Sequence, residues 1–254
     1  MRTKPYERDL KFLLRIVKNA QNYILKNMKK MVIKDKGDND VVTNLDYGVE
    51  KYFTEEIKNN YPTFDIVSEE FNPKAILTDN CFIFDPIDGT SAFTHGLPTW
   101  GIQIAMIKNK KFVASVVAVP CLKEIYWAVK GHGAYLNGKR IHVSDEDSRK
   151  CYYSLIGRKD KFKVLETLHK ENPFNKDFAS ISYTMGLIAR GTLGGLAFYR
   201  NYIWDIAPGT MICREAGAKI YDIDGKGIIV ANTDELLELL KKHSLPALNL
   251  NNKS

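Results

Sequence analysis

Long apolar runs are absent from this chain of 254 residues. No stretch of about 18 or more apolar residues occurs, so we expect no membrane-spanning helix. The first residues, MRTKPYERDLK, carry too much charge for a secretory signal peptide. Cysteine is scarce and forms no C-x-x-C pair, so we expect reduced core residues, not disulfides or metal ligands (Cys81, Cys121, Cys151 and Cys213). These absences favour a globular cytoplasmic protein.

Positive charge is in excess, because 37 lysines and arginines outnumber 30 aspartates and glutamates and give a formal net charge of +7. This balance favours anionic ligands. The basic residues stand in small scattered groups, as is typical of a solvated surface, so we do not expect nucleic acid as a partner. The chain length fits one large domain or two tightly packed halves.

Hydrophobic periodicity predicts an α+β protein. We expect helices over 6–30 and about 44–60, the second with Asn44 as its N-cap, and a charged loop at 34–40 between them. Strands are expected at 64–68, 81–84, 99–107, 111–119 and 124–130, with hairpin turns at Asn109-Lys110 and Asn137-Gly138.

Strands and helices alternate after a polar connector near residue 145. The expected strands are 151–157, 178–182 and 195–200, and the expected helices are 159–171, 183–190, one from about 205, and 234–243 before a loose tail. We therefore predict two halves, 1–145 and 146–254, in one compact unit.

The stretch CFIFDPIDGTSAFTHGLP, residues 81–98, places two carboxylates at the end of a buried strand. Asp85 ends the apolar run, and Asp88 follows three residues later. Asp-Pro and Asp-Gly are ordinary turn formers, which is one interpretation. The other is a metal site, because Mg²⁺ takes carboxylate and carbonyl oxygens, and N–H groups at a helix start after Gly89 hold phosphate well.

More acidic residues stand where apolar structure would deliver them to such a site. Glu69 and Glu70 follow a strand, Asp205 follows Trp204 at a helix start, and Asp46 lies in the first turn of the second helix. Taken singly, each also fits a surface acid or a charge at a helix N-terminus.

Three segments together resemble the inositol monophosphatase family: KGDNDVVTNLD (36–46), SEE (68–70) ahead of DPIDGTSAFTHGLP (85–98), and WDIAPGTMICREAGAKIYDIDG (204–225). That family belongs to the Mg²⁺-dependent, lithium-sensitive sugar phosphatases, which include fructose-1,6-bisphosphatases. The resemblance covers nearly the whole chain. It implies a layered α-β-α-β-α sandwich, a homodimer, two or three Mg²⁺ ions per active site, and hydrolysis of a small phosphorylated metabolite.

The resemblance also implies a role for each matching residue. The implied metal ligands are Glu69 and Asp85 for a first ion, Asp85, Asp88 and Asp205 for a second, Asp46 with Glu69 for a third and weaker one, and the backbone carbonyl of Ile87. Thr90 and Glu69 would orient the attacking water. The backbone amides of Gly89, Thr90 and Ser91 would hold the phosphate.

The substrate is left open by the sequence. Family members that prefer inositol phosphate commonly carry an acid seven residues before the Asp of the Trp-Asp pair, where this chain has Phe198, and no residue from 194 to 202 is acidic. Phe198 with Tyr199, Tyr202 and Arg200 could form a pocket for a second phosphate or a stacked base. Packing of Phe198 in the core or in a dimer interface is the alternative. Candidate substrates are inositol phosphates, fructose-1,6-bisphosphate, the 2′-phosphate of NADP, histidinol phosphate and 3′-phosphoadenosine 5′-phosphate.

Two rival interpretations remain. A haloacid-dehalogenase-type phosphatase uses its first Asp as nucleophile and places the second two residues on, whereas Asp85 and Asp88 are three apart. A non-catalytic role in binding RNA or protein would use the basic surface, but it gives no reason for clustered carboxylates, which repel nucleic acid.

Overall fold

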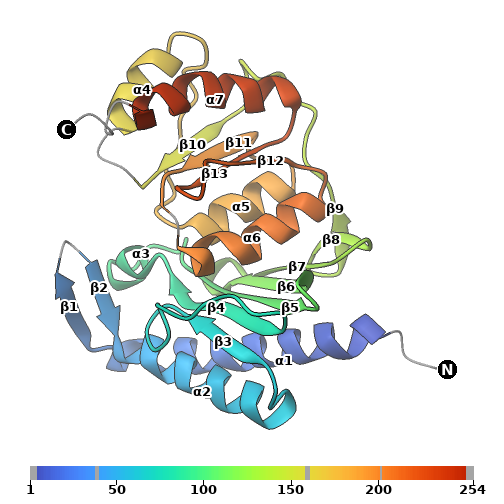
Figure 1. Cartoon of the computed structure of the whole chain (residues 1–254). Helices are drawn as coiled ribbons and strands as arrows, with labels where there is room; N and C mark the ends of the chain where they lie inside the picture. Colours follow the sequence, from blue (N-terminus) through green and yellow to red (C-terminus); the bar gives the residue numbers. More distant parts are fainter. Residues whose placement is uncertain (1–4, 38–39, 158–160, 201, 250–254) are drawn as a thin grey trace.

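The computed structural model describes residues 5–37, 40–157, 161–200 and 202–249. Five layers are stacked (Figure 1): helices α1 (Pro5–Asn27) and α2 (Asn44–Asn60), a seven-stranded sheet, helices α5 (Ile181–Ala189) and α6 (Ile203–Glu215), a four-stranded sheet, and helices α4 (Lys161–Leu168) and α7 (Asp234–Asn249). The predicted α-β-α-β-α sandwich is confirmed. None of the described helices is long and apolar enough to cross a membrane.

The seven-stranded sheet has the strand order of the chain: β3 (Asp65–Ser68), β4 (Cys81–Asp88), β5 (Gly101–Lys108), β6 (Lys111–Val119), β7 (Glu124–Val129), β8 (Gly133–Leu136) and β9 (Lys139–Ile141). Only β3 and β4 pair in parallel within it. Both predicted hairpin turns are confirmed, and their residues have positive φ, as tight two-residue hairpin turns require.

The four-stranded sheet has the order β10 (Tyr153–Ile156), β11 (Gly195–Phe198), β13 (Ile228–Ala231) and β12 (Lys219–Asp222). A short helix, α3 (Thr90–Thr94), follows β4, and two 3₁₀ turns occupy Met28–Lys30 and Pro120–Leu122.

Alternation along β4 explains how the site is positioned. Phe82 and Phe84 pack into the core beneath α1 and α2. Cys81 and Ile83 face the other way and pack with Trp204 of α6. A rigid, fully buried strand therefore ends in acidic residues on the side of α6.

The N-terminal loop prediction is wrong. Residues 34–37 and 40 belong to two antiparallel paired strands, β1 (Ile33–Gly37) and β2 (Asp40–Thr43), and residues 38–39 lie outside the described residues. Every residue of β1 is exposed, so the hydrophobic alternation that reveals a half-buried strand is missing. Thr43, and not Asn44, caps α2, since its side chain accepts hydrogen bonds from the first turn.

Other local predictions also need correction. Residues 178–182 form no strand; α5 begins at Ile181, and Ser180 is its N-cap. The last helix runs to Asn249 instead of ending at 243, and the predicted tail beyond 249 lies outside the described residues. Strand β4 continues past residue 84 to Asp88. All four cysteines are free, but Cys121 is exposed and is not a core residue.

Candidate active site

Three carboxylates from two elements meet between the seven-stranded sheet and α6. Each of Asp85, Asp88 and Asp205 offers a carboxylate oxygen, and these oxygens lie within 4.8 Å of one another. Asp85 and Asp88 are buried at the end of β4, where the pairing with β5 is irregular between them. That irregularity turns the chain, so that two residues three apart point to one place.

Asp88 is held by the start of α5. Its Oδ2 atom accepts hydrogen bonds from the Ser180 hydroxyl, from the Ser182 hydroxyl at 2.5 Å and from the Ser182 backbone N–H at 2.8 Å. The Ile181 N–H lies 3.4 Å from Oδ1. Ser182 was missed by sequence reasoning, because the segment that contains it was predicted to be a strand.

The turn after β4 is built by its own side chains. Asp85 Oδ1 accepts a hydrogen bond from Ile87 N–H at 2.9 Å, and the Thr90 hydroxyl donates to the Ile87 carbonyl at 2.8 Å. A threonine hydroxyl has one proton, so Thr90 is left with lone pairs that can accept a hydrogen bond from water.

Gly89 precedes α3 in the left-handed conformation, with φ +77°. A Cβ there would lie 2.8 Å from the Ala179 carbonyl oxygen, so the loop before α5 packs directly on this turn. Thr90 is half-buried and Ser91 is exposed at the start of α3, where the first backbone N–H groups of a helix have no intrahelical acceptor.

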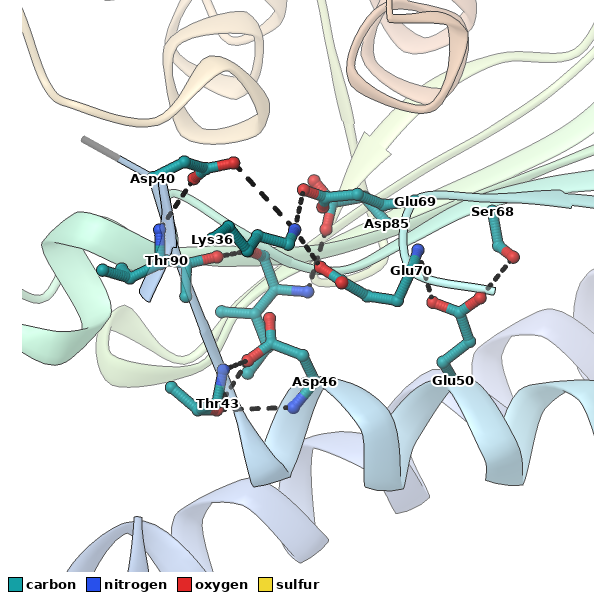
Figure 2. Close-up of polar contacts among 12 residues, drawn as sticks. Lys36, Asp40, Thr43, Asp46, Glu50, Ser68, Glu69, Glu70, Asp85 and Thr90 are labelled. Atoms are coloured by element: carbon teal, nitrogen blue, oxygen red, sulfur yellow. Dashed lines mark hydrogen bonds and ion pairs between the residues drawn. The ribbon is translucent and has the colours of Figure 1, made fainter. Parts of the chain in front are cut away.

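Lys36, on the β1–β2 hairpin, faces the acidic pair after β3 (Figure 2). Its ammonium lies 3.2 Å from Glu69 Oε1 and 2.6 Å from Glu70 Oε1. Burial lowers the pKa of Lys36, but the two glutamates raise it by more, so the lysine is charged. Sequence reasoning missed this role, although Lys36 opens the first of the three segments on which the resemblance rests.

Glu50, in the middle of α2, holds the chain that carries Glu69 (Figure 2). Its buried carboxylate accepts hydrogen bonds from the Ser68 hydroxyl, from Glu70 N–H at 3.0 Å and from Phe71 N–H at 2.7 Å. The role of Glu50 was also not predicted, because the sequence around an acid on a helix does not identify hydrogen-bond partners that are distant along the chain.

Asp46 belongs to the capping box of α2. Its Oδ2 atom accepts hydrogen bonds from Thr43 N–H at 2.8 Å and from the Thr43 hydroxyl at 2.5 Å. Its Oδ1 atom is buried and has no hydrogen-bond partner among the described residues. One oxygen therefore serves the helix, and the other is free to act as a ligand.

Burial raises the pKa of six carboxylates here: those of Asp46, Glu50, Glu69, Asp85, Asp88 and Asp205. Burial and then the charges of Glu69 and Asp88 raise the pKa of Asp85, and burial followed by the charge of Asp88 does the same for Asp205. Burial raises the pKa of Asp46 and of Glu69 to about 7. Buried carboxylates that repel one another, one with an unpartnered oxygen, fit a site for hard divalent cations such as Mg²⁺.

Phe198 is buried, so the predicted pocket around its ring is wrong and the alternative of core packing is correct. Its side chain is 3% exposed and packs in the core between the two sheets. Tyr199 is buried as well, and its hydroxyl donates to Ser244. Arg200 is exposed, its Nε donates to the Gly157 carbonyl at 3.3 Å, and its charge partly offsets the rise in the pKa of Asp205 that burial causes.

Comparisons with known proteins agree with this geometry. The model of the inositol monophosphatase family matches residues 6–249. The "Fructose-1,6-bisphosphatase/inositol-1-monophosphatase" of Thermotoga maritima is 33% identical over 198 residues, or 77% of this chain and 76% of that protein. Human "Inositol monophosphatase 1" is 32% identical and covers 89% of this chain and 86% of its own length. The solved structure of "Thermotoga maritima IMPase TM1415" superposes with a TM-score of 0.86 at 28% identity, over 94% of this chain and 99% of that one.

Other similar proteins carry further names. Two structures of an "IMPase/NADP phosphatase", one with Mg²⁺ and phosphate and one with NADP and Ca²⁺, share the fold at a TM-score of 0.85 and 21% identity, each over 94% of this chain and 95% or 96% of its own. A "Nus factor SuhB" of Pseudomonas aeruginosa is 27% identical over 94% of this chain and 98% of its own.

The fold and the buried carboxylates define a divalent-metal-dependent phosphatase. Within that class, the chain belongs to the inositol monophosphatase family.

Proposed function

We propose that this phosphatase uses Mg²⁺ ions held by Glu69, Asp85, Asp88 and Asp205 and by the Ile87 carbonyl, with Asp46 and Glu69 at a third, weaker position. The single observation that carries this proposal is the convergence of Asp85, Asp88 and Asp205 within 4.8 Å. When bound, such ions lower the pKa of water and neutralise charge on a phosphate.

The residues of the chain supply positioning around those ions. Thr90 accepts a hydrogen bond from the attacking water, because its own proton is used on the Ile87 carbonyl. Glu69 contacts the same water and orients it together with Thr90. The N–H groups of Gly89, Thr90 and Ser91 hold the phosphate, and water attacks directly, without a phosphorylated aspartate.

The preferred substrate carries a second anionic group beyond the phosphate that is cleaved. Position 198 is a buried phenylalanine and no acid stands from 194 to 202, so this segment offers no carboxylate to accept hydrogen bonds from cyclitol hydroxyls. Arg200 instead offers an exposed cation near Asp205. The names of the Thermotoga relative and of the IMPase/NADP phosphatase include fructose-1,6-bisphosphatase and NADP phosphatase beside inositol monophosphatase.

Phosphate release with Mg²⁺ tests this function across fructose-1,6-bisphosphate, NADP, 3′-phosphoadenosine 5′-phosphate, histidinol phosphate and inositol 1-phosphate. EDTA should abolish release, and Asp88→Asn should lower turnover by about 100-fold or more with the fold retained. Asp234→Asn, a change at an exposed acid at the start of the outer helix α7, is the matched control. Full activity in excess EDTA would refute metal dependence, and the highest kcat/KM with inositol 1-phosphate would refute the substrate preference.

The finer partners and the location are part of the same proposal. We expect a homodimer in the cytoplasm, which light scattering and cell fractionation would check. The SuhB relatives make a nucleic-acid partner worth testing by RNA binding in the same preparation, although the buried acidic site gives such a partner no contact.

A further inference from the structure

Gln103, in the middle of β5, has an unexplained side chain. The residue is fully buried, and neither Oε1 nor Nε2 of its amide has a hydrogen-bond partner among the described residues. Burying an amide without partners costs free energy, and folded proteins rarely leave both atoms of one amide unpaired. The amide therefore needs a partner that the polypeptide itself does not provide.

The sheet register places Gln103 directly opposite Asp85. Residues that face each other on neighbouring antiparallel strands project to the same side of the sheet, with their Cβ atoms roughly 4.5–5.5 Å apart. The next pair on that side is Ile83 with Ala105, followed by Cys81 with Ile107. Cys81, Ile83 and Ile107 pack with Trp204 of α6, so Gln103 stands where this apolar strip meets the carboxylates.

Gly101 confirms which face of β5 this is. It lies two residues before Gln103 on the same side of the strand. A Cβ on Gly101 would lie 2.3 Å from the Ser182 hydroxyl, which donates to Asp88. The side of β5 that carries Gln103 therefore packs against a residue that holds Asp88, one of the three clustered carboxylates.

We propose that Gln103 is a positioning residue of the metal site, whose amide finds its hydrogen-bond partners on Asp85 and on the waters of the loaded site. An amide suits this place because Nε2 donates to a carboxylate oxygen while Oε1 accepts from water. A second acid there would add to the repulsion, and an apolar side chain would support neither partner. The inference rests on the proposed metal-dependent function and adds a residue to it.

The proposal predicts effects of opposite sign in the metal-free and metal-loaded protein. Without metal, the unpaired amide destabilises the folded protein, so an apolar side chain of similar shape should raise the Tm by a few degrees or leave it unchanged. With metal, the same change removes support from a ligand, and loss of such supporting groups typically weakens metal binding by about 10–100-fold.

Thermal unfolding in EDTA and across a Mg²⁺ titration measures both quantities without any substrate. Gln103→Met is nearly isosteric, and Gln103→Leu is a second apolar replacement. Both should fold without metal and should need about tenfold more Mg²⁺ than the wild type for the same rise in Tm above the value in EDTA. Ser154→Ala is the matched control, because the Ser154 hydroxyl is also buried and unpartnered but lies in the four-stranded sheet. This control should leave the Mg²⁺ concentration needed for that rise in Tm unchanged.

Each other outcome overturns the proposal. If the Mg²⁺ concentration needed for the same rise in Tm is within twofold of wild type in both variants, the amide does not serve the site. Failure of both variants to fold in EDTA shows that the amide stabilises the metal-free protein and does not destabilise it. Absence of any Mg²⁺ effect on the wild-type Tm removes the metal site itself, and the proposal falls with it.

Discussion

Glu50 is the place where a change outside the carboxylate cluster should most clearly alter metal dependence. Its carboxylate, at the centre of α2, accepts three hydrogen bonds from the segment that carries Glu69 and Glu70. Glu50→Gln keeps the size of the side chain but replaces one acceptor oxygen with an NH₂ group. The perturbation is therefore confined to hydrogen bonding.

The magnitude follows from the geometry. Oε1 accepts from Ser68 and Phe71, and Oε2 accepts from Glu70, so either orientation of the amide leaves at least one backbone N–H facing a donor. A buried N–H without an acceptor costs about 1–3 kcal/mol. For a chain of this size, the Tm should fall by roughly 2–12 °C. Because the same segment positions Glu69, we also expect the Mg²⁺ requirement of phosphate release to rise about tenfold.

The assay is phosphate release at saturating substrate over a Mg²⁺ series, paired with thermal unfolding. Glu56→Gln is the control, since Glu56 lies on the same helix but pairs with Arg15 at the surface, where an ion pair contributes at most about 1 kcal/mol. If Glu50→Gln lowered the Tm but left the Mg²⁺ dependence unchanged, Glu50 would be a structural residue only. If neither changed, the reasoning from its hydrogen bonds would be refuted.

Two further predictions concern pH and the turn after β4. Since burial raises the pKa of Asp46 and Glu69 to about 7 from ordinary values near 4, the folded metal-free protein binds more protons than the unfolded chain between these values. The Tm in EDTA should therefore fall as pH rises from about 4 to 7, and saturating Mg²⁺ should remove most of that pH dependence. A Tm that rises with pH in EDTA would contradict this prediction. Gly89→Ala should lower the free energy of unfolding by more than about 2 kcal/mol and remove most of the activity, because backbone strain at φ +77° adds to a 2.8 Å approach of the new Cβ to the Ala179 carbonyl oxygen. Gly96→Ala is the control for backbone strain alone, since Gly96 has φ +75° and nothing lies within 4 Å of a Cβ at that position. Equal losses of Tm and activity in the two variants would disprove the role of the close approach.

The layered fold and the convergence of Asp85, Asp88 and Asp205 could be predicted from the sequence, since the order of the three matched segments carries both. The supporting residues could not. The hydrogen-bond partners of Glu50 lie 18 to 21 residues away along the chain, and the local sequence pattern of α2 does not predict them. Gln103 sits in a strand of apolar residues, and only the sheet register brings it opposite Asp85.

The local errors have physical causes as well. The β1–β2 hairpin is polar and exposed, so it lacks the alternation by which strands are recognised. In FASIS, residues 178–182, alternating side chains imitate a strand, but the Ser180 hydroxyl accepts a hydrogen bond from Tyr183 N–H and starts a helix there. Phe198 was ambiguous from sequence because an aromatic residue serves a pocket or a core equally well, and tertiary packing alone decides between them.

Metal binding and the packing of α5 and α6 on the seven-stranded sheet should stabilise each other. Asp85 and Asp88 come from the seven-stranded sheet, whereas Asp205 and Ser182 come from α6 and α5, which lie between that sheet and the four-stranded one (Figure 1). An ion that binds only the assembled cluster stabilises that assembly, by about 2.7 kcal/mol at a hundredfold excess over its Kd. The reverse must hold to the same extent, since a linkage between two equilibria is mutual. Substitutions that loosen the contact between Ser182 and Gly101 should therefore raise the Mg²⁺ requirement without touching a ligand, so that metal affinity reports how well the central helices pack on the sheet.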